Sequence, residues 1–184
     1  MLTCLKKAFD LAKQHYPPAH PLRRSARWNL AATQFERGNL VAATEGFEEL
    51  LHNPDGAPPL PAQELAELQR NLGASYFHRG DIERALPYTE AALATTRSEY
   101  GEAHPRTLDT LQNLAAMLHQ DGRYDAAKDT AWQAILATEA AYGPDDPRLS
   151  SMLQNLAVMH FRPEEAADAE ALLRRAEEIV RTHR

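Results

Sequence analysis

The chain has 184 residues, a formal net charge of −6 and 25% charged residues, which suits one domain or a small repeat array. This acidity disfavours a nucleic-acid partner, because such proteins usually carry a basic patch. A single cysteine, Cys4, excludes an intrachain disulfide and a zinc site built from several thiolates. The apolar runs are far shorter than the roughly 18 residues of a membrane span, and Lys6 and Lys7 interrupt any signal peptide. We therefore expect a soluble, cytoplasmic protein with neither a nucleic-acid nor a membrane partner.

The leading segment, residues 1–16, matches the second half of a repeat found later in the chain. Ala8 aligns with Ala92, and Tyr16 aligns with Tyr100. The segment therefore predicts a second helix whose first helix is missing. Four blocks of equal length follow it, at 17–58, 59–100, 101–142 and 143–184.

Each block contains an Asn-Leu pair, and the pairs recur every 42 residues. A small residue follows each pair, a glycine lies nine residues after the first three asparagines, and an alanine lies fourteen residues after all four. Several positions that keep one spacing without insertion indicate an internal repeat. The four asparagines are Asn29, Asn71, Asn113 and Asn155.

Each block predicts two helices. In block 101–142, Pro105 suits a first helical turn, and leucines from Leu108 to Leu118 follow a helical period up to Gly122, a typical cap. A second helix is expected from about Tyr124 until Gly143-Pro144. No segment alternates as a strand would, so we expect an all-α fold of about nine helices.

Two blocks depart from the pattern. The connector 53–61 is rich in proline and glycine and lacks the Tyr-Gly form of the connectors at 100–105 and 142–147. In the last block Pro163-Glu164 stands where the turn glycine is expected, and Pro163 should stop the preceding helix. The charged helix expected at 164–184 would close the array as a polar end cap.

The stretch 71–85, NLGASYFHRGDIERA, resembles the tetratricopeptide repeat (TPR). The usual period of that repeat is 34, and the period of 42 with Tyr-Gly-x-x-His/Asp-Pro connectors is similar to the variant found in kinesin light chains. The resemblance covers nearly all of residues 1–184. It implies a single array that forms a right-handed α-solenoid of antiparallel helix pairs, the TPR superhelix.

The resemblance also implies that peptides bind along the inner face of the superhelix, which the first helices line. The face around each asparagine is polar, whereas the opposite face carries leucine. An amide offers two donors and one acceptor, which suits clamping of a peptide backbone, and the residue before each asparagine could set selectivity. The alternative is that the asparagines belong to the repeat itself and bond a neighbouring helix. The candidate peptide-binding residues are Asn29, Asn71, Asn113, Asn155, Trp28, Arg70, Gln112, Gln154, His78, Gln120 and Arg162.

The charges along this face do not favour a clamp for a terminal carboxylate. That clamp needs several cations, whereas the polar face mixes arginine and histidine with Glu36, Glu67 and Asp109. A ligand of mixed or weakly basic character fits better.

The histidines and serines do not form a catalytic or metal-binding pattern. His78, His119 and His160 are spaced by 41 residues, one short of the repeat, so they should not converge. His20 and His104 precede a proline, as Asp146 does, which predicts helix capping. We expect no cofactor, no metal and no enzymatic activity.

These features predict a scaffold or adaptor that binds a peptide or protein segment on the concave TPR face. The alternative is a regulatory or sensory subunit of a protease- or switch-type complex, which would bind through the ends of the array. Met1, Leu5 and Ala8 would face the missing first helix and would be exposed in a lone monomer. We expect another subunit, a second copy or further sequence to cover this N-terminal edge.

Overall fold

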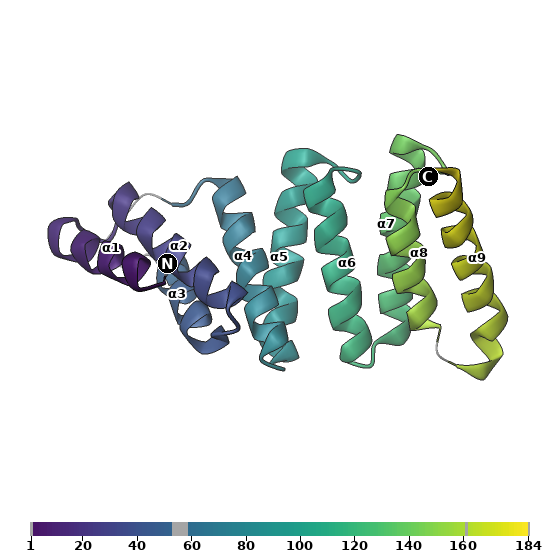
Figure 1. The fold of residues 1–184 in the computed structure, drawn as a ribbon, viewed down its shortest axis with the longest axis horizontal. Coiled ribbons are helices and arrows are strands. Elements are labelled where there is room, and N and C mark those ends of the chain that lie inside the picture. Colours follow the sequence, from purple (N-terminus) through teal and green to yellow (C-terminus); the bar gives the residue numbers. More distant parts are fainter. Residues whose placement is uncertain (1, 53–58, 161, 184) are drawn as a thin grey trace. The chain divides into compact units, whose positions relative to one another are not determined.

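The computed structural model of the chain describes residues 2–52, 59–160 and 162–183. These ranges contain nine α-helices, one short 3-10 helix and no strand (Figure 1). The all-α prediction is therefore confirmed. Met1 of the expected N-terminal edge and residues 53–58 of the unusual connector, with the block boundary at Pro58, lie outside the described residues. The helices are α1 (Leu2–His15), α2 (Pro21–Glu36), α3 (Leu40–His52), α4 (Ala62–His78), α5 (Ile82–Tyr100), α6 (Pro105–Gln120), α7 (Tyr124–Tyr142), α8 (Arg148–Met159) and α9 (Ala166–Thr182), and the 3-10 helix is Pro163–Glu165.

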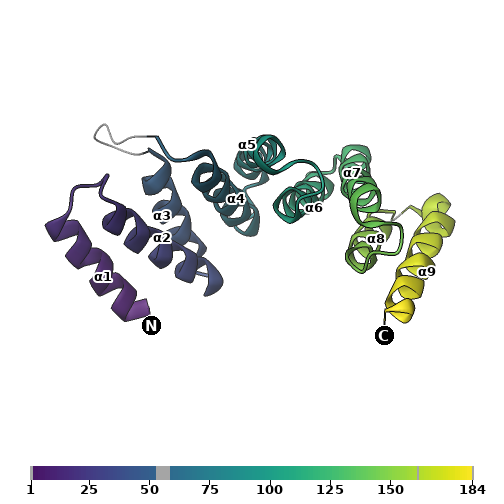
Figure 2. The same cartoon turned by 90° about the horizontal axis from the view of Figure 1, so that it is seen from above.

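The helices group into two compact units, Met1–Thr95 and Thr96–Arg184, and the division falls inside α5. We call them the N-terminal unit and the C-terminal unit. In the N-terminal unit, α1 packs on α2, α2 on α3 and α3 on α4, each helix beside the next along the chain (Figure 2). In the C-terminal unit, α6, α7, α8 and α9 pack in the same consecutive way. Consecutive packing of helix pairs is the arrangement of a helical repeat solenoid.

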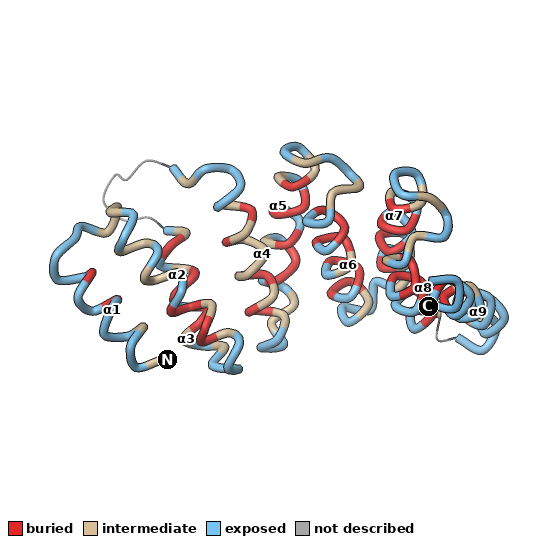
Figure 3. Tube along the Cα trace, turned by 45° about the horizontal axis from the view of Figure 1, so that its top comes forward, coloured by how far each residue is buried: buried red, intermediate tan, exposed pale blue. Residues whose placement is uncertain are grey.

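The leucine of each Asn-Leu pair lies in the core, and the buried residues line the faces where helices meet (Figure 3). Leu72 and Leu156 are 0% exposed, whereas Asn29, Asn113 and Asn155 are exposed. The repeat thus directs the leucine side of each first helix inward, as the sequence predicts, and the asparagine side is exposed in three of them, whereas Asn71 is half-buried.

Small residues allow the two helices of a pair to approach closely. A Cβ atom at Gly73 on α4 would lie 2.3 Å from the hydroxyl of Thr89 on α5, closer than real carbon contacts. The second-helix alanines Ala43, Ala85 and Ala127 are 0% exposed, and Ala169 in the last repeat is half-buried. The close packing expected from the alanines is therefore confirmed in three of the four repeats.

The turns inside the first three repeats use glycine in the left-handed region. Gly38, Gly80 and Gly122 have φ angles of 76°, 80° and 81°, which glycine adopts without steric cost. In the last repeat α8 ends at Met159, and the 3-10 helix that starts at Pro163 leads into α9. The prediction of a different turn in the last repeat is therefore confirmed, but the prediction that Pro163 stops the preceding helix is wrong, because α8 ends four residues earlier and Pro163 begins the 3-10 helix.

The residues that precede the connector prolines cap the following helices. The Nδ1 atoms of His20 and His104 accept hydrogen bonds from the amides of Leu22 and Arg106, both at 3.2 Å. The Asp146 carboxylate accepts one from the amide of Arg148 at 3.0 Å. The prediction that these histidines serve as caps is confirmed.

Candidate functional site

Aromatic side chains close three of the connectors between repeats. Tyr16 stacks on His20 with ring centroids 4.1 Å apart, and Tyr100 stacks on His104 at 4.5 Å. Tyr142 lies against Arg148, whose guanidinium is 3.5 Å from the ring centroid. These tyrosines occupy one position of the repeat, at the end of each second helix.

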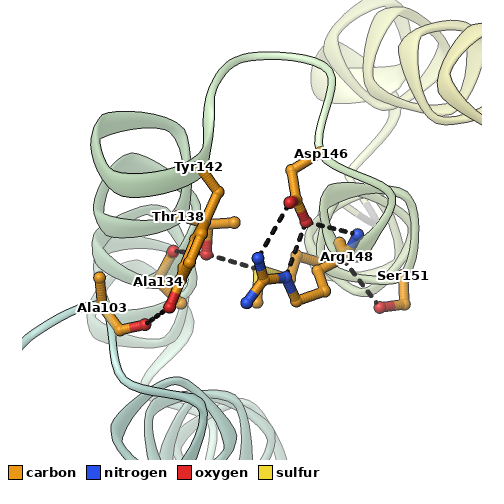
Figure 4. A network of polar contacts seen from close by, with 8 residues as sticks. Ala103, Ala134, Thr138, Tyr142, Asp146, Arg148 and Ser151 are labelled. Atoms are coloured by element: carbon orange, nitrogen blue, oxygen red, sulfur yellow. Dashed lines mark hydrogen bonds and ion pairs between the residues drawn. The ribbon is translucent and has the colours of Figure 1, made fainter.

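The α7–α8 connector is the most elaborate of these closures (Figure 4). The Tyr142 hydroxyl donates to the carbonyl of Ala103 at 3.0 Å. Arg148 donates to both carboxylate oxygens of Asp146, at 2.7 and 2.9 Å. The Arg148 guanidinium holds the pKa of Asp146 below its ordinary value, and the carboxylate raises the pKa of Arg148 in turn.

The connector that leads into α4 carries proline at position 58, where the other connectors have tyrosine. Beside the described end of this connector the N-terminal unit contains a pocket of about 640 Å³, which we call the α2–α4 pocket. Ligand pockets typically span about 300–1,000 Å³. Its lining comes from α2, the end of α3, the connector and α4: Pro21, Arg24, Ser25, Trp28, Asn29, Leu50, Pro59, Leu60, Pro61, Glu64, Glu67 and Leu68.

The pocket joins an apolar wall to a charged rim. Trp28 is half-buried and packs edge-on against the core residue Phe47, with centroids 5.9 Å apart. Arg24 forms an ion pair with Glu64 at 2.8 Å, and their side chains are 22% and 58% exposed. The accessible charge of this pair is therefore mainly the Glu64 carboxylate.

Two of the expected binding residues, Trp28 and Asn29, meet in this pocket. Arg24, Leu60 and Glu64 were not among the residues expected at a site. The sequence indicates these residues only indirectly. Leu60 belongs to the connector that departs from the repeat, and Arg24 and Glu64 lie near the starts of two consecutive first helices.

In the C-terminal unit the expected amides meet across α6 and α8. Asn155 donates through Nδ2 to Oε1 of Gln112 at 3.2 Å. Asn113 and Gln154, the neighbours of this pair in sequence, are exposed. Both amides of the hydrogen bond were predicted as binding residues, and their contact also agrees with the alternative that the amides bond neighbouring helices.

The remaining candidates do not join the α2–α4 pocket. Arg70 and Asn71 are half-buried on α4, outside the pocket lining. His78 is the exposed last residue of α4, 5.5 Å from the ring of Phe35. Gln120 is the exposed last residue of α6, and Arg162 is exposed just before the 3-10 helix.

The N-terminal edge is formed by α1. Phe9 and Ala12 are buried, whereas Ala8 is exposed and Leu11 is 56% exposed. Leu5 is half-buried. Coverage of this edge by another subunit stays a prediction.

Among the described residues, no group of three or more His, Cys, Asp or Glu side chains could hold a metal ion. None of the described helices is long and apolar enough to cross a membrane.

Comparison with known proteins identifies the repeat. Two family models described as "Tetratricopeptide repeat" match residues 64–135 and 24–45, together just over half of the chain. A comparison with curated protein sequences found no match. The chain belongs to the tetratricopeptide repeat family, and members of this family are in general interaction modules without catalytic activity.

Solved structures agree on the fold. The chain is similar to the "putative kinesin light chain nearly identical TPR-like repeats" of Podosopora anserina, with a TM-score of 0.88, 18% identity, and coverage of 100% of this chain and 87% of the other. It is also similar to YrrB, "a TPR protein with an unusual peptide-binding site" (TM-score 0.66, 17% identity, 97% and 75% covered). A third similar structure is the Rap conjugation gene regulator of plasmid pLS20 in complex with the Phr* peptide (TM-score 0.69, 16% identity, 85% and 42% covered).

Proposed function

We propose that the chain is an adaptor that binds an extended peptide segment of a partner protein through the exposed amide faces of its first helices. One observation carries the proposal: Asn155 and Gln112, from two successive first helices, lie within hydrogen-bond distance on the exposed side of the C-terminal unit. A peptide backbone presents alternating donors and acceptors. The two amides can exchange their mutual hydrogen bond for hydrogen bonds to that backbone.

The exposure of the asparagines supports binding over a purely structural role. Buried polar groups need partners inside the protein, but Asn29 and Asn113 are exposed, and neither side chain forms a hydrogen bond within the described ranges. Their amides are therefore free to bond a ligand. The peptide-binding relatives described above provide precedent for ligand binding on this fold.

The test replaces three amides at once, with Asn71→Ala, Asn113→Ala and Asn155→Ala in one chain. The partner is first identified by co-purification and mass spectrometry, and its binding segment is then titrated as a synthetic peptide. An amide hydrogen bond contributes about 0.5–1.5 kcal/mol, so the triple variant should bind at least about tenfold more weakly.

The matched control is Gln14→Ala, which removes an exposed amide from α1, outside the first helices. It should leave the affinity unchanged. Full affinity in the triple variant would reject the amide face as the site. The alternative of binding through the ends of the array predicts instead that Leu11→Asp on α1 abolishes binding.

A further inference from the structure

The connector beside the α2–α4 pocket has an equivalent two repeats further along the chain, between α7 and α8. We call the junction of such a connector with its neighbouring helices a seam. Residues 84 positions apart are equivalent in the repeat, so Leu50, Glu64 and Leu68 correspond to Ala134, Arg148 and Met152. In the C-terminal unit the connector carries Tyr142, whose ring lies against Arg148 and whose hydroxyl donates to the Ala103 carbonyl (Figure 4). At this connector the repeat therefore places an aromatic ring, 43% exposed in the case of Tyr142, against the start of the following first helix.

In the N-terminal unit the sequence provides no tyrosine at the equivalent position, which is Pro58, and the seam contains the 640 Å³ pocket. Its lining includes apolar residues from four elements, of which Trp28 and Leu60 are half-buried whereas Leu50 and Leu68 are buried behind them. Burying an aromatic ring against such a wall is favourable by the area that it removes from water.

The rim of the pocket favours a cation beside that ring. Glu64 stands where the C-terminal unit has Arg148, and its side chain is 58% exposed although it pairs with Arg24. The arginine of this pair is largely covered, at 22% exposed, so an approaching ligand meets the carboxylate. Asn29 lies in the same lining and can bond the backbone on either side of the inserted residue.

We propose that the α2–α4 pocket is the specificity site of the peptide-binding face and that it takes an aromatic side chain with a basic residue next to it. This inference rests on the proposed function, because it assigns the recognised side chains within that face. The peptide's ring occupies the place that Tyr142 fills in the C-terminal unit, and its lysine or arginine pairs with Glu64.

The experiment selects ligands from a phage-displayed library of random 12-residue peptides, with the full chain as bait. The enriched peptides should share an aromatic residue adjacent to lysine or arginine. One of them is synthesised and titrated by fluorescence in a Trp132→Phe background, where Trp28 is the only remaining tryptophan. Binding should change the emission of Trp28, which lines the pocket.

Ser25→Phe should occupy the pocket with the protein's own ring and weaken the peptide at least about tenfold, as loss of a buried anchor does. Ser25 is exposed, so the fold should tolerate the change. The matched control is Ser98→Phe, which alters an exposed serine on α5, outside the first helices, and should change the affinity less than twofold.

The charge is tested with Glu64→Gln, which keeps an acceptor for Arg24. This variant should weaken the basic peptide about threefold to tenfold and leave a version with glutamine in place of the basic residue unchanged, because rim charges contribute modestly.

Enriched peptides without a common aromatic residue, or equal losses in Ser25→Phe and Ser98→Phe, would overturn the pocket assignment. Those peptides would still support the proposed function if the triple asparagine variant lost them. A library that yields no enriched peptide would count against both proposals.

Discussion

The seam between α3 and α4 and the seam between α7 and α8 occupy the same place in the repeat and are built in opposite ways. In the C-terminal unit Tyr142, Arg148 and Asp146 close the connector with a ring contact and charged hydrogen bonds. In the N-terminal unit Arg24 and Glu64 join the starts of α2 and α4, and a pocket lies beside them. If the proposed pocket binds a peptide, one position of the repeat contributes to stability in the C-terminal unit and to binding in the N-terminal unit.

The cores behind these seams agree at the Asn-Leu positions. Leu72 and Leu156 are both fully buried, and the small residues that follow them, Gly73 and Ala157, are buried too. Other core positions differ in side-chain type, since Leu50 and Leu68 correspond to Ala134 and Met152. Substitutions in the core and in the seam should therefore test the contribution of each to stability separately.

The largest effect is expected from emptying the cores, with Leu72→Ala in one variant and Leu156→Ala in another. Each change leaves a cavity in a fully buried site, for which the cost is about 2–5 kcal/mol. Urea unfolding measures the loss, and hydrogen exchange locates it in the unit that carries the substitution. Losses that differ by more than about 2 kcal/mol would show that the two cores are not equivalent.

The helices and the core were predictable because they depend on periodic patterns. The Asn-Leu pairs fixed which side of each first helix is buried, and Gly38, Gly80 and Gly122 marked the turns from sequence alone. Capping by His20 and His104 was predictable for the same reason, since a cap involves residues two positions apart.

The pocket was only half predictable. Trp28 and Asn29 keep the spacing of the repeat and were expected at the site. Glu64 and Leu60 also line the pocket, but they lie where the sequence of this repeat differs from that of the others. The sequence shows that position 58 is not a tyrosine, but the pocket depends on how Leu50, Leu60 and Trp28 pack. Such packing of residues far apart in the chain is not encoded in any local pattern.

The seam itself should show an intermediate effect. Tyr142→Ala removes the ring from Arg148 and the hydrogen bond to Ala103, which together should cost about 1–2 kcal/mol at this partly exposed site. Tyr142→Phe keeps the ring and should lose about 0.5–1 kcal/mol. Thermal unfolding compares the two variants.

If both tyrosine variants unfold like the parent chain, closure of the α7–α8 seam does not contribute to stability. The absence of a tyrosine at Pro58 would then say nothing about the purpose of the α2–α4 pocket. A clear loss in Tyr142→Ala would show that the N-terminal unit forgoes stabilisation at this position, as binding sites commonly do.

The smallest effect is expected on the stability of the folded state at acid pH. Arg148 lowers the pKa of Asp146, and Lys128 lowers the pKa of Glu165 through a hydrogen bond of 2.7 Å. Because both pKa values are depressed in the folded state, these carboxylates stabilise it at pH values above their unfolded pKa, and that stability is lost as the pH falls through the folded pKa. Both lie in the C-terminal unit, so its amides should lose hydrogen-exchange protection first as the pH falls below about 4.

Asp146→Asn tests this charge at the closed seam. Asparagine can still accept the cap bond from the amide of Arg148, but it cannot pair with the guanidinium as an anion. The variant should lose about 0.2–1 kcal/mol near pH 7, the range of a partly exposed ion pair, and this difference from the parent should shrink in acid as Asp146 itself becomes protonated. A difference that persists unchanged at low pH would assign the effect to the cap, and the closed seam would then depend on the Tyr142 ring and not on charge.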